Sequence, residues 1–89
     1  MRKETFTVHG AKVTFTEVVG VFNGDELNAI LIHDENDINH EGDSITSDYC
    51  GFPETDEEAR LICDYSITTW NFTVENGKYN VSDKYIVNG

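Results

Sequence analysis

Acidic side chains are concentrated in the middle of the chain, where they could bind metal ions or basic groups. Of the 17 Asp and Glu residues, 13 lie between residues 25 and 64, and Arg60 is the only Lys or Arg in that stretch. Carboxylates accept hydrogen bonds from Lys and Arg, often two at once from Arg, and they are also the ligands that Ca²⁺ prefers. The stretch therefore predicts a strongly negative surface that binds either a basic partner or calcium.

A shorter pattern inside this stretch has the spacing of a calcium loop. When Asp37 is counted as position 1, side-chain oxygens fall at positions 1, 3, 5, 7 and 12 (Asp37, Asn39, Glu41, Asp43 and Asp48), with Gly42 at position 6. This pattern resembles an EF-hand or dockerin loop, whose oxygens surround the ion and whose glycine allows a sharp turn. Glu at position 5, Asp at position 12 and flanks unlike paired helices depart from the family. Calcium binding by residues 37–48 is therefore the alternative hypothesis, beside a plain solvated loop.

Nitrogen ligands do not form a metal motif in this sequence. His9, His33 and His40 are not spaced as metal ligands, and His33 with Asp34 and Asp37 would hold an ion only loosely. A histidine at the end of a strand is usually an ordinary surface residue. We therefore predict no metal site and no cofactor.

The two cysteines do not indicate catalysis. Cys50 and Cys63 fit neither a disulfide framework nor a zinc pattern and are interpreted as reduced thiols, with a single bridge as the alternative. Cys50 with His40 is the one nucleophile–base pair to consider, but negative charge nearby raises the pKa of a thiol and opposes a reactive thiolate. Because there is also no Gly-rich phosphate loop, we predict that the protein is not an enzyme and has no catalytic residues.

Length and charge limit the remaining classes. The 89 residues make one domain, and a hydrophobic content of 38% is enough for a modest core. A formal net charge of −11 repels nucleic acid and anionic membranes and attracts basic partners. The first residues lack the apolar core of a secretion signal, and no stretch approaches the roughly 20 apolar residues of a membrane span. We therefore expect a cytoplasmic protein that binds neither nucleic acid nor membrane directly.

The first third of the chain predicts three strands. Alternating apolar and Thr residues over 4–16 indicate a hairpin, with Gly10 and Ala11 in the turn and Val8 and Phe6 paired with Val13 and Phe15. The second strand continues to residue 22 and ends at an Asn-Gly turn. Residues 26–33 read as a third strand, although a short helix also fits.

A long acidic loop, a helix and a second hairpin complete the prediction. Residues 34–54 lack periodicity and are expected to be a loop attached to the core by Ile45, Tyr49 and Phe52. Thr55 and Glu58 form a capping box, which predicts a helix over 56–65 with Leu61, Ile62 and Tyr65 turned inward.

Residues 67–87 read as a hairpin centred on Asn76 and Gly77. Its predicted register pairs Glu75 with Lys78 as opposite charges, Val74 with Tyr79 and Phe72 with Val81, with Trp70 on the apolar face. Together these elements predict an α+β fold in a single domain, residues 1–89: a mostly antiparallel sheet of about five strands, in the order strand–strand–strand–helix–strand–strand, with one helix packed on it.

These features predict a small acidic inhibitor that works by protein–protein binding. In size, charge and lack of a catalytic motif, the chain resembles the small acidic inhibitors of bacteriophages, including anti-restriction and anti-CRISPR proteins, many of which imitate DNA. The resemblance implies a basic, nucleic-acid-binding partner such as a nuclease or defence complex, met in the host cytoplasm if the protein is phage-encoded. The protein itself would be a monomer or homodimer. The expected contact surface comprises the acidic residues Asp34, Glu35, Asp37, Glu41, Asp43, Asp48, Glu54, Asp56, Glu57 and Glu58, with Tyr49 and Phe52 as apolar anchors.

Overall fold

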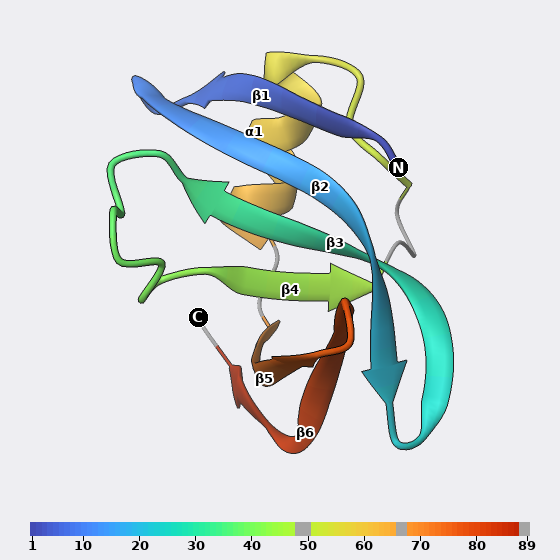
Figure 1. Ribbon diagram of the computed structural model, residues 1–89. Helices are drawn as coiled ribbons and strands as arrows, with labels where there is room; N and C mark the ends of the chain where they lie inside the picture. The colour runs from blue at the N-terminus through green and yellow to red at the C-terminus, as the bar shows by residue number, and fades with distance from the viewer. Residues whose placement is uncertain (48–50, 66–67, 88–89) are drawn as a thin grey trace.

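The part of the chain that the structure describes forms a six-stranded mixed sheet and one helix (Figure 1). The computed structural model describes residues 1–47, 51–65 and 68–87, of which 65, 68–71 and 82–87 are described by their backbone only. The elements are β1 (Lys3–Val8), β2 (Ala11–Phe22), β3 (Asp25–Asp34), β4 (Ser44–Ser47), α1 (Asp56–Tyr65), β5 (Thr68–Glu75) and β6 (Lys78–Val87). The sheet order is β4-β3-β2-β6-β5, with β1 also paired to β2, and only the β2–β6 pairing is parallel. The predicted α+β fold is confirmed. The sheet has one strand more than expected because β4 lies inside the segment predicted as a loop.

The three hairpin turns share one backbone geometry. The pairs His9 and Gly10, Asn23 and Gly24, and Asn76 and Gly77 all have positive φ, with values of 50° and 79° for the first. Positive φ at both central residues defines a type I′ turn, whose twist matches that of the strands. The predicted first turn was therefore wrong by one residue: Phe6 pairs with Val13 and Val8 with Ala11. The partner shifts by two positions, so the same side chains still face the core.

Strands β2 and β3 are buried on both faces. Phe15 and Ile30 point to the α1 side, whereas Val18 and Ala29 point to the other and form a second cluster with Ile45 and others. A strand covered on both sides needs consecutive apolar residues instead of alternating ones. This explains why residues 29–32 carry an unbroken apolar run that also fits a helix, and it settles that segment as a strand.

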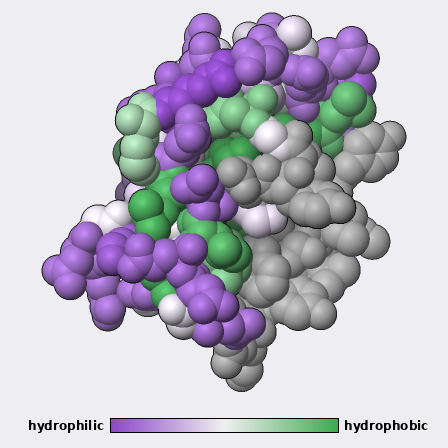
Figure 2. Space-filling view, turned by 90° about the vertical axis from the view of Figure 1, so that its right-hand side faces the viewer, coloured by the Kyte–Doolittle hydropathy of each residue, from purple (hydrophilic) through white to green (hydrophobic). Residues whose placement is uncertain are grey.

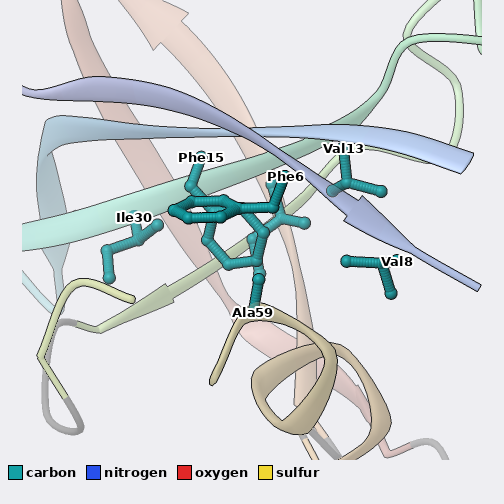
Figure 3. Close-up of a cluster of buried hydrophobic side chains, with 7 residues drawn as sticks. Phe6, Val8, Val13, Phe15, Ile30 and Ala59 are labelled. Atoms are coloured by element: carbon teal, nitrogen blue, oxygen red, sulfur yellow. The ribbon is translucent and has the colours of Figure 1, made fainter. Parts of the chain in front are cut away.

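The first cluster lies between the sheet and α1 (Figure 3). Strands β1, β2 and β3 and the helix contribute Phe6, Val8, Val13, Phe15, Ile30, Ile32 and Ala59, with Phe52, Ile62 and Cys63 packed against them. The helix thus presents Ala59, Ile62 and Cys63, which share one face by helical spacing. Leu61 was predicted to point inward but is exposed, because it lies two residues from Ala59 and therefore on another side of the helix. The side chain of Tyr65 lies outside the described residues.

The second cluster lies on the opposite face of the sheet. Its buried residues are Val18, Ala29, Ile45 and Val81, with Phe22, Leu31, Phe72 and Tyr79 packed against them. The β5–β6 register agrees with the prediction for Phe72, Val74 and Glu75, although Val74 is largely exposed and Trp70 lies outside the described side chains. Strand β5 also packs against β4, so the sheet curls around this cluster.

Lys78 does not form the predicted ion pair with Glu75. Its Nζ lies 2.5 Å from Glu26 Oε2 at the start of β3. Glu75 Oε2 instead accepts a hydrogen bond from Asn80 Nδ2 at 3.1 Å. The β5–β6 register does place Glu75 and Lys78 opposite each other, but Lys78 forms its ion pair with Glu26 on β3.

The start of α1 is capped as the sequence predicts. Thr55 Oγ1 accepts a hydrogen bond from the Glu58 N–H at 3.1 Å, and Glu58 Oε1 accepts one from the Glu54 N–H at 2.7 Å. The reciprocal bond of the capping box is therefore made one residue earlier than the usual pattern. Both bonds satisfy amides that the helix cannot pair internally.

We expect Thr55→Ala to lower the free energy of unfolding by about 1 kcal/mol, because one helix amide loses its acceptor. Thr55→Ser is the matched control, since it keeps a hydroxyl at the cap and should stay close to the wild type. Urea unfolding followed by circular dichroism measures both. An alanine variant as stable as the serine variant would contradict the capping role.

Candidate functional site

The structure divides the predicted contact residues into two groups. The loop carboxylates lie at the last residue of β3 and in the β3–β4 connection: Asp34, Glu35, Asp37, Glu41 and Asp43. The helix-start carboxylates lie at the beginning of α1: Glu54, Asp56, Glu57 and Glu58. In Figure 1 the first group is beyond the end of β3 at the left and the second is at the top, so the two are separate in space. Asp48 and Tyr49 lie outside the described residues.

The β3–β4 connection is built from turns that its own carboxylates close. The Asp34 backbone carbonyl accepts a hydrogen bond from the Asp37 N–H at 2.9 Å, and that of Asp37 accepts one from the His40 N–H at 3.1 Å. The Asp37 carboxylate then accepts the amides of Glu41 at 3.3 Å and Gly42 at 2.6 Å. A Cβ on Gly42 would lie 3.1 Å from Asp37 Oδ2, so glycine lets this carboxylate reach the backbone. The loop is therefore held in shape by defined hydrogen bonds.

Two histidines meet at one aspartate beneath this loop. Asp43, only 7% exposed at its side chain, places Oδ1 2.6 Å from His33 Nδ1 and Oδ2 2.9 Å from His40 Nδ1. The two imidazole rings are stacked, with centroids 4.0 Å apart and planes 16° from parallel. The hydrogen bond that His33 donates to the Asp43 carboxylate raises the pKa of His33 above its ordinary value, with further contributions from the charges of Asp43, Glu35 and Asp37 that outweigh partial desolvation.

His33 and His40 lie together in the fold although their sequence spacing fits no metal motif. Strand β4 is the reason, because Ile32 pairs with Ser44 and the next position along the two strands joins His33 to Asp43. The turns of the connection bring His40 over the same carboxylate. His9 is apart from this group and lies 2.8 Å from Asp64 at the end of α1. The cluster depends on the β3–β4 pairing, and the four residues of β4 give no periodic pattern from which that pairing could be predicted.

A row of polar side chains ties the histidine cluster to the sheet. Thr5 and Thr14 hydroxyls on β1 and β2 are 2.8 Å apart, and Thr14, which is buried, donates a short hydrogen bond to Glu35 Oε1. Glu35 Oε2 in turn lies 3.7 Å from His33 Nε2. The network therefore runs from β1 through β2 into the β3–β4 connection.

The helix-start carboxylates are anchored differently. Arg2 donates hydrogen bonds to both oxygens of Glu54, at 2.9 and 2.7 Å, and also bonds Glu4. The bond from Arg2 holds the pKa of Glu54 below its usual range. Asp56 Oδ1 accepts the Thr7 N–H of β1 at 3.1 Å. Glu57 is left exposed, with its closest cation, Arg60, at 3.8 Å.

Phe52 is not the freely exposed anchor that was expected. Its ring packs edge-on against the ring of Phe15, with the two centroids 6.5 Å apart. The Arg2 guanidinium lies over the Phe52 ring, with its Cζ 4.4 Å from the ring centroid. The residue joins the acidic segment to the first core cluster, as predicted for loop attachment. Its side chain is therefore engaged within the fold.

The positions of the loop oxygens and of the Cys63 thiol give little support to the calcium hypothesis or to the thiol hypothesis. The 37–48 segment leads from one strand into another, and Asp37 and Asp43 direct their oxygens at amides and imidazoles. Cys63 is half-buried against the core, and burial raises the pKa of its thiol. Cys50 lies outside the described residues. Within the described residues, no thiolate is poised for nucleophilic attack.

No protein-family model, curated protein or solved structure matches the chain. Within residues 1–47, 51–65 and 68–87, the structure contains no helix long and apolar enough to cross a membrane. Function is therefore argued from the charges and contacts described above.

Figure 2 shows how polar and apolar residues are distributed on one side of the molecule. Hydrophilic residues gather in two areas of this face, at the top and at the lower left, with hydrophobic residues between them. A partner that covers this face would meet polar areas on both sides of an apolar one.

Proposed function

We propose that this protein is a small acidic inhibitor that binds a basic, nucleic-acid-binding protein and occupies the site where that partner holds phosphates. The observation that carries the proposal is the net charge of −11 on an 89-residue domain, far beyond the magnitude of roughly 2–8 that solubility requires. Such an excess stores repulsion within the fold. A groove rich in Lys and Arg would relieve that repulsion.

The few basic residues leave most of this charge uncompensated. Arg2, Arg60 and Lys78 are already in ion pairs within the chain. Glu41 and Glu57 remain exposed. Exposed carboxylates of this kind can accept the bidentate hydrogen bonds that Arg gives to phosphate.

The anchoring of the carboxylates also favours recognition of a partner. Asp37 is fixed by loop amides, Asp56 by the Thr7 amide and Glu54 by Arg2. Groups fixed before binding lose less conformational freedom on association. The protein would thus present carboxylates at set positions, as a nucleic acid presents phosphates.

We further propose that the partner is a nuclease or another component of a defence complex, which would make this an anti-restriction or anti-CRISPR type of inhibitor acting in the cytoplasm. The proposal requires no catalysis. Inhibition would follow from occupation of the phosphate site alone.

Affinity capture tests the proposal. Tagged protein is incubated with nuclease-treated bacterial lysate at moderate salt, and retained proteins are identified by mass spectrometry. We expect one basic, nucleic-acid-binding protein that is released when duplex DNA is added. Failure to retain any such protein would indicate that the charge serves only solubility, and retention that DNA does not affect would contradict occupation of the phosphate site.

A further inference from the structure

We propose that His33, His40 and Asp43 form a site for a divalent transition-metal ion, with Zn²⁺ as the best fit. The site is separate from the partner-binding proposal and does not depend on it. Each residue offers one ligand atom, and these atoms all lie within 4.8 Å of one another. Two imidazoles and one carboxylate are a ligand set that zinc accepts, with a fourth position left for water.

The three ligand atoms lie close enough together to reach one ion, but the two rings are stacked almost parallel, so one of them would turn to bring its nitrogen lone pair onto that ion. His33 Nδ1 and His40 Nδ1 both point at Asp43, at 2.6 and 2.9 Å from its two oxygens. With zinc–ligand bonds of about 2.0–2.1 Å, neighbouring ligand atoms in a tetrahedron are about 3.3 Å apart. When an ion replaces the shared protons, each contact to Asp43 would open by less than about 1 Å, and the His40 ring, which is largely exposed, would turn out of the stack.

A carboxylate lies near the second ring nitrogen of His33, as is common around metal-ligating histidines. A ligating histidine usually turns its second ring nitrogen toward a carboxylate, which fixes the ring. Here Glu35 Oε2 lies 3.7 Å from His33 Nε2, and Glu35 is itself held by the buried Thr14 hydroxyl. The β3–β4 pairing and the Asp37 turn fix the remaining ligands.

The donor set separates zinc from calcium. Calcium takes six to eight oxygen ligands, whereas imidazole suits zinc, copper and nickel. A site with two nitrogen atoms among its three ligands is therefore not expected to bind calcium. This distinguishes it from the calcium loop suggested by the sequence of 37–48.

Isothermal titration calorimetry with zinc chloride on the full chain tests the proposal, with excess Mg²⁺ present to occupy surface carboxylates. We expect one zinc ion per chain and no competition by calcium. His40→Ala should weaken zinc binding by at least about tenfold, since even supporting residues of metal sites contribute that much. His40 is 61% exposed, so its removal leaves both core clusters intact.

His9→Ala is the matched control. His9 is 63% exposed and also contacts an aspartate, yet it is apart from the cluster, so its loss should leave zinc affinity unchanged. Cobalt(II) gives a second readout, because a tetrahedral site with nitrogen ligands has strong visible absorption that His40→Ala and Asp43→Asn should remove. Absence of zinc binding, or equal binding by the wild type and both histidine variants, would overturn the proposal and leave the cluster as a hydrogen-bonded clamp.

Discussion

Phe15→Ala is expected to destabilise the domain by about 3–5 kcal/mol, the usual loss for a buried Phe replaced by Ala. Phe15 is fully buried between the sheet and α1. Its ring makes edge-on contacts with Phe6 and Phe52, with centroids 5.6 and 6.5 Å apart. A small domain has only about 5–15 kcal/mol of stability in total, so this loss is a large share of it and should clearly lower the midpoints of thermal and urea unfolding.

Val74→Ala is the control for Phe15→Ala. Val74 is also an apolar strand residue, but it is 56% exposed, and its replacement should change stability by no more than about 0.5 kcal/mol. Thermal and urea unfolding of both variants measures the contrast. If Phe15→Ala were as stable as Val74→Ala, the packing of α1 on the sheet would be wrong.

The double variant Glu41→Lys, Glu57→Lys is expected to weaken partner binding by at least about 100-fold. One residue comes from each carboxylate group, and neither makes a hydrogen bond that the fold needs. Close charge pairs across interfaces contribute about 1.5 kcal/mol or more each, and 1.4 kcal/mol corresponds to a tenfold change in affinity. The lower net negative charge favours the fold, whereas a lysine at position 57 meets the positive end of the helix dipole and Arg60, so we expect a stability loss of no more than about 1 kcal/mol.

Asp25→Lys, Glu75→Lys changes the net charge by the same amount at exposed hairpin positions outside both groups. We expect this control to retain most of the affinity, with a modest loss of association rate from weaker steering. Titration of the captured partner with each variant gives the comparison. Equal affinities for the two double variants would contradict a localised acidic interface.

Local sequence signals predicted most of the fold because they act over a few residues. Asn23 with Gly24 and Asn76 with Gly77 dictate type I′ turns, and these fix the register of their hairpins. Thr55 and Glu58 similarly set the start of α1. The first turn was misplaced because His9 adopts the positive φ that was expected of glycine alone.

The candidate site was less predictable because it depends on contacts between distant segments. Strand β4 is four residues long and carries a single buried apolar residue, Ile45, so its sequence shows no alternating pattern that would predict a strand. Because β4 was not predicted, nothing in the sequence indicated that His33 contacts Asp43. The division of the carboxylates into two groups likewise depends on β4, which follows the first group along the chain and precedes the second.

The most direct test of the proposed function is whether this protein displaces duplex DNA from the purified partner. Fluorescence anisotropy of a labelled duplex would be followed while the wild type or Glu41→Lys, Glu57→Lys is added. We predict complete displacement by the wild type, weakened by added salt, and little displacement by the double variant. Simultaneous binding of DNA and this protein to the partner would contradict the account.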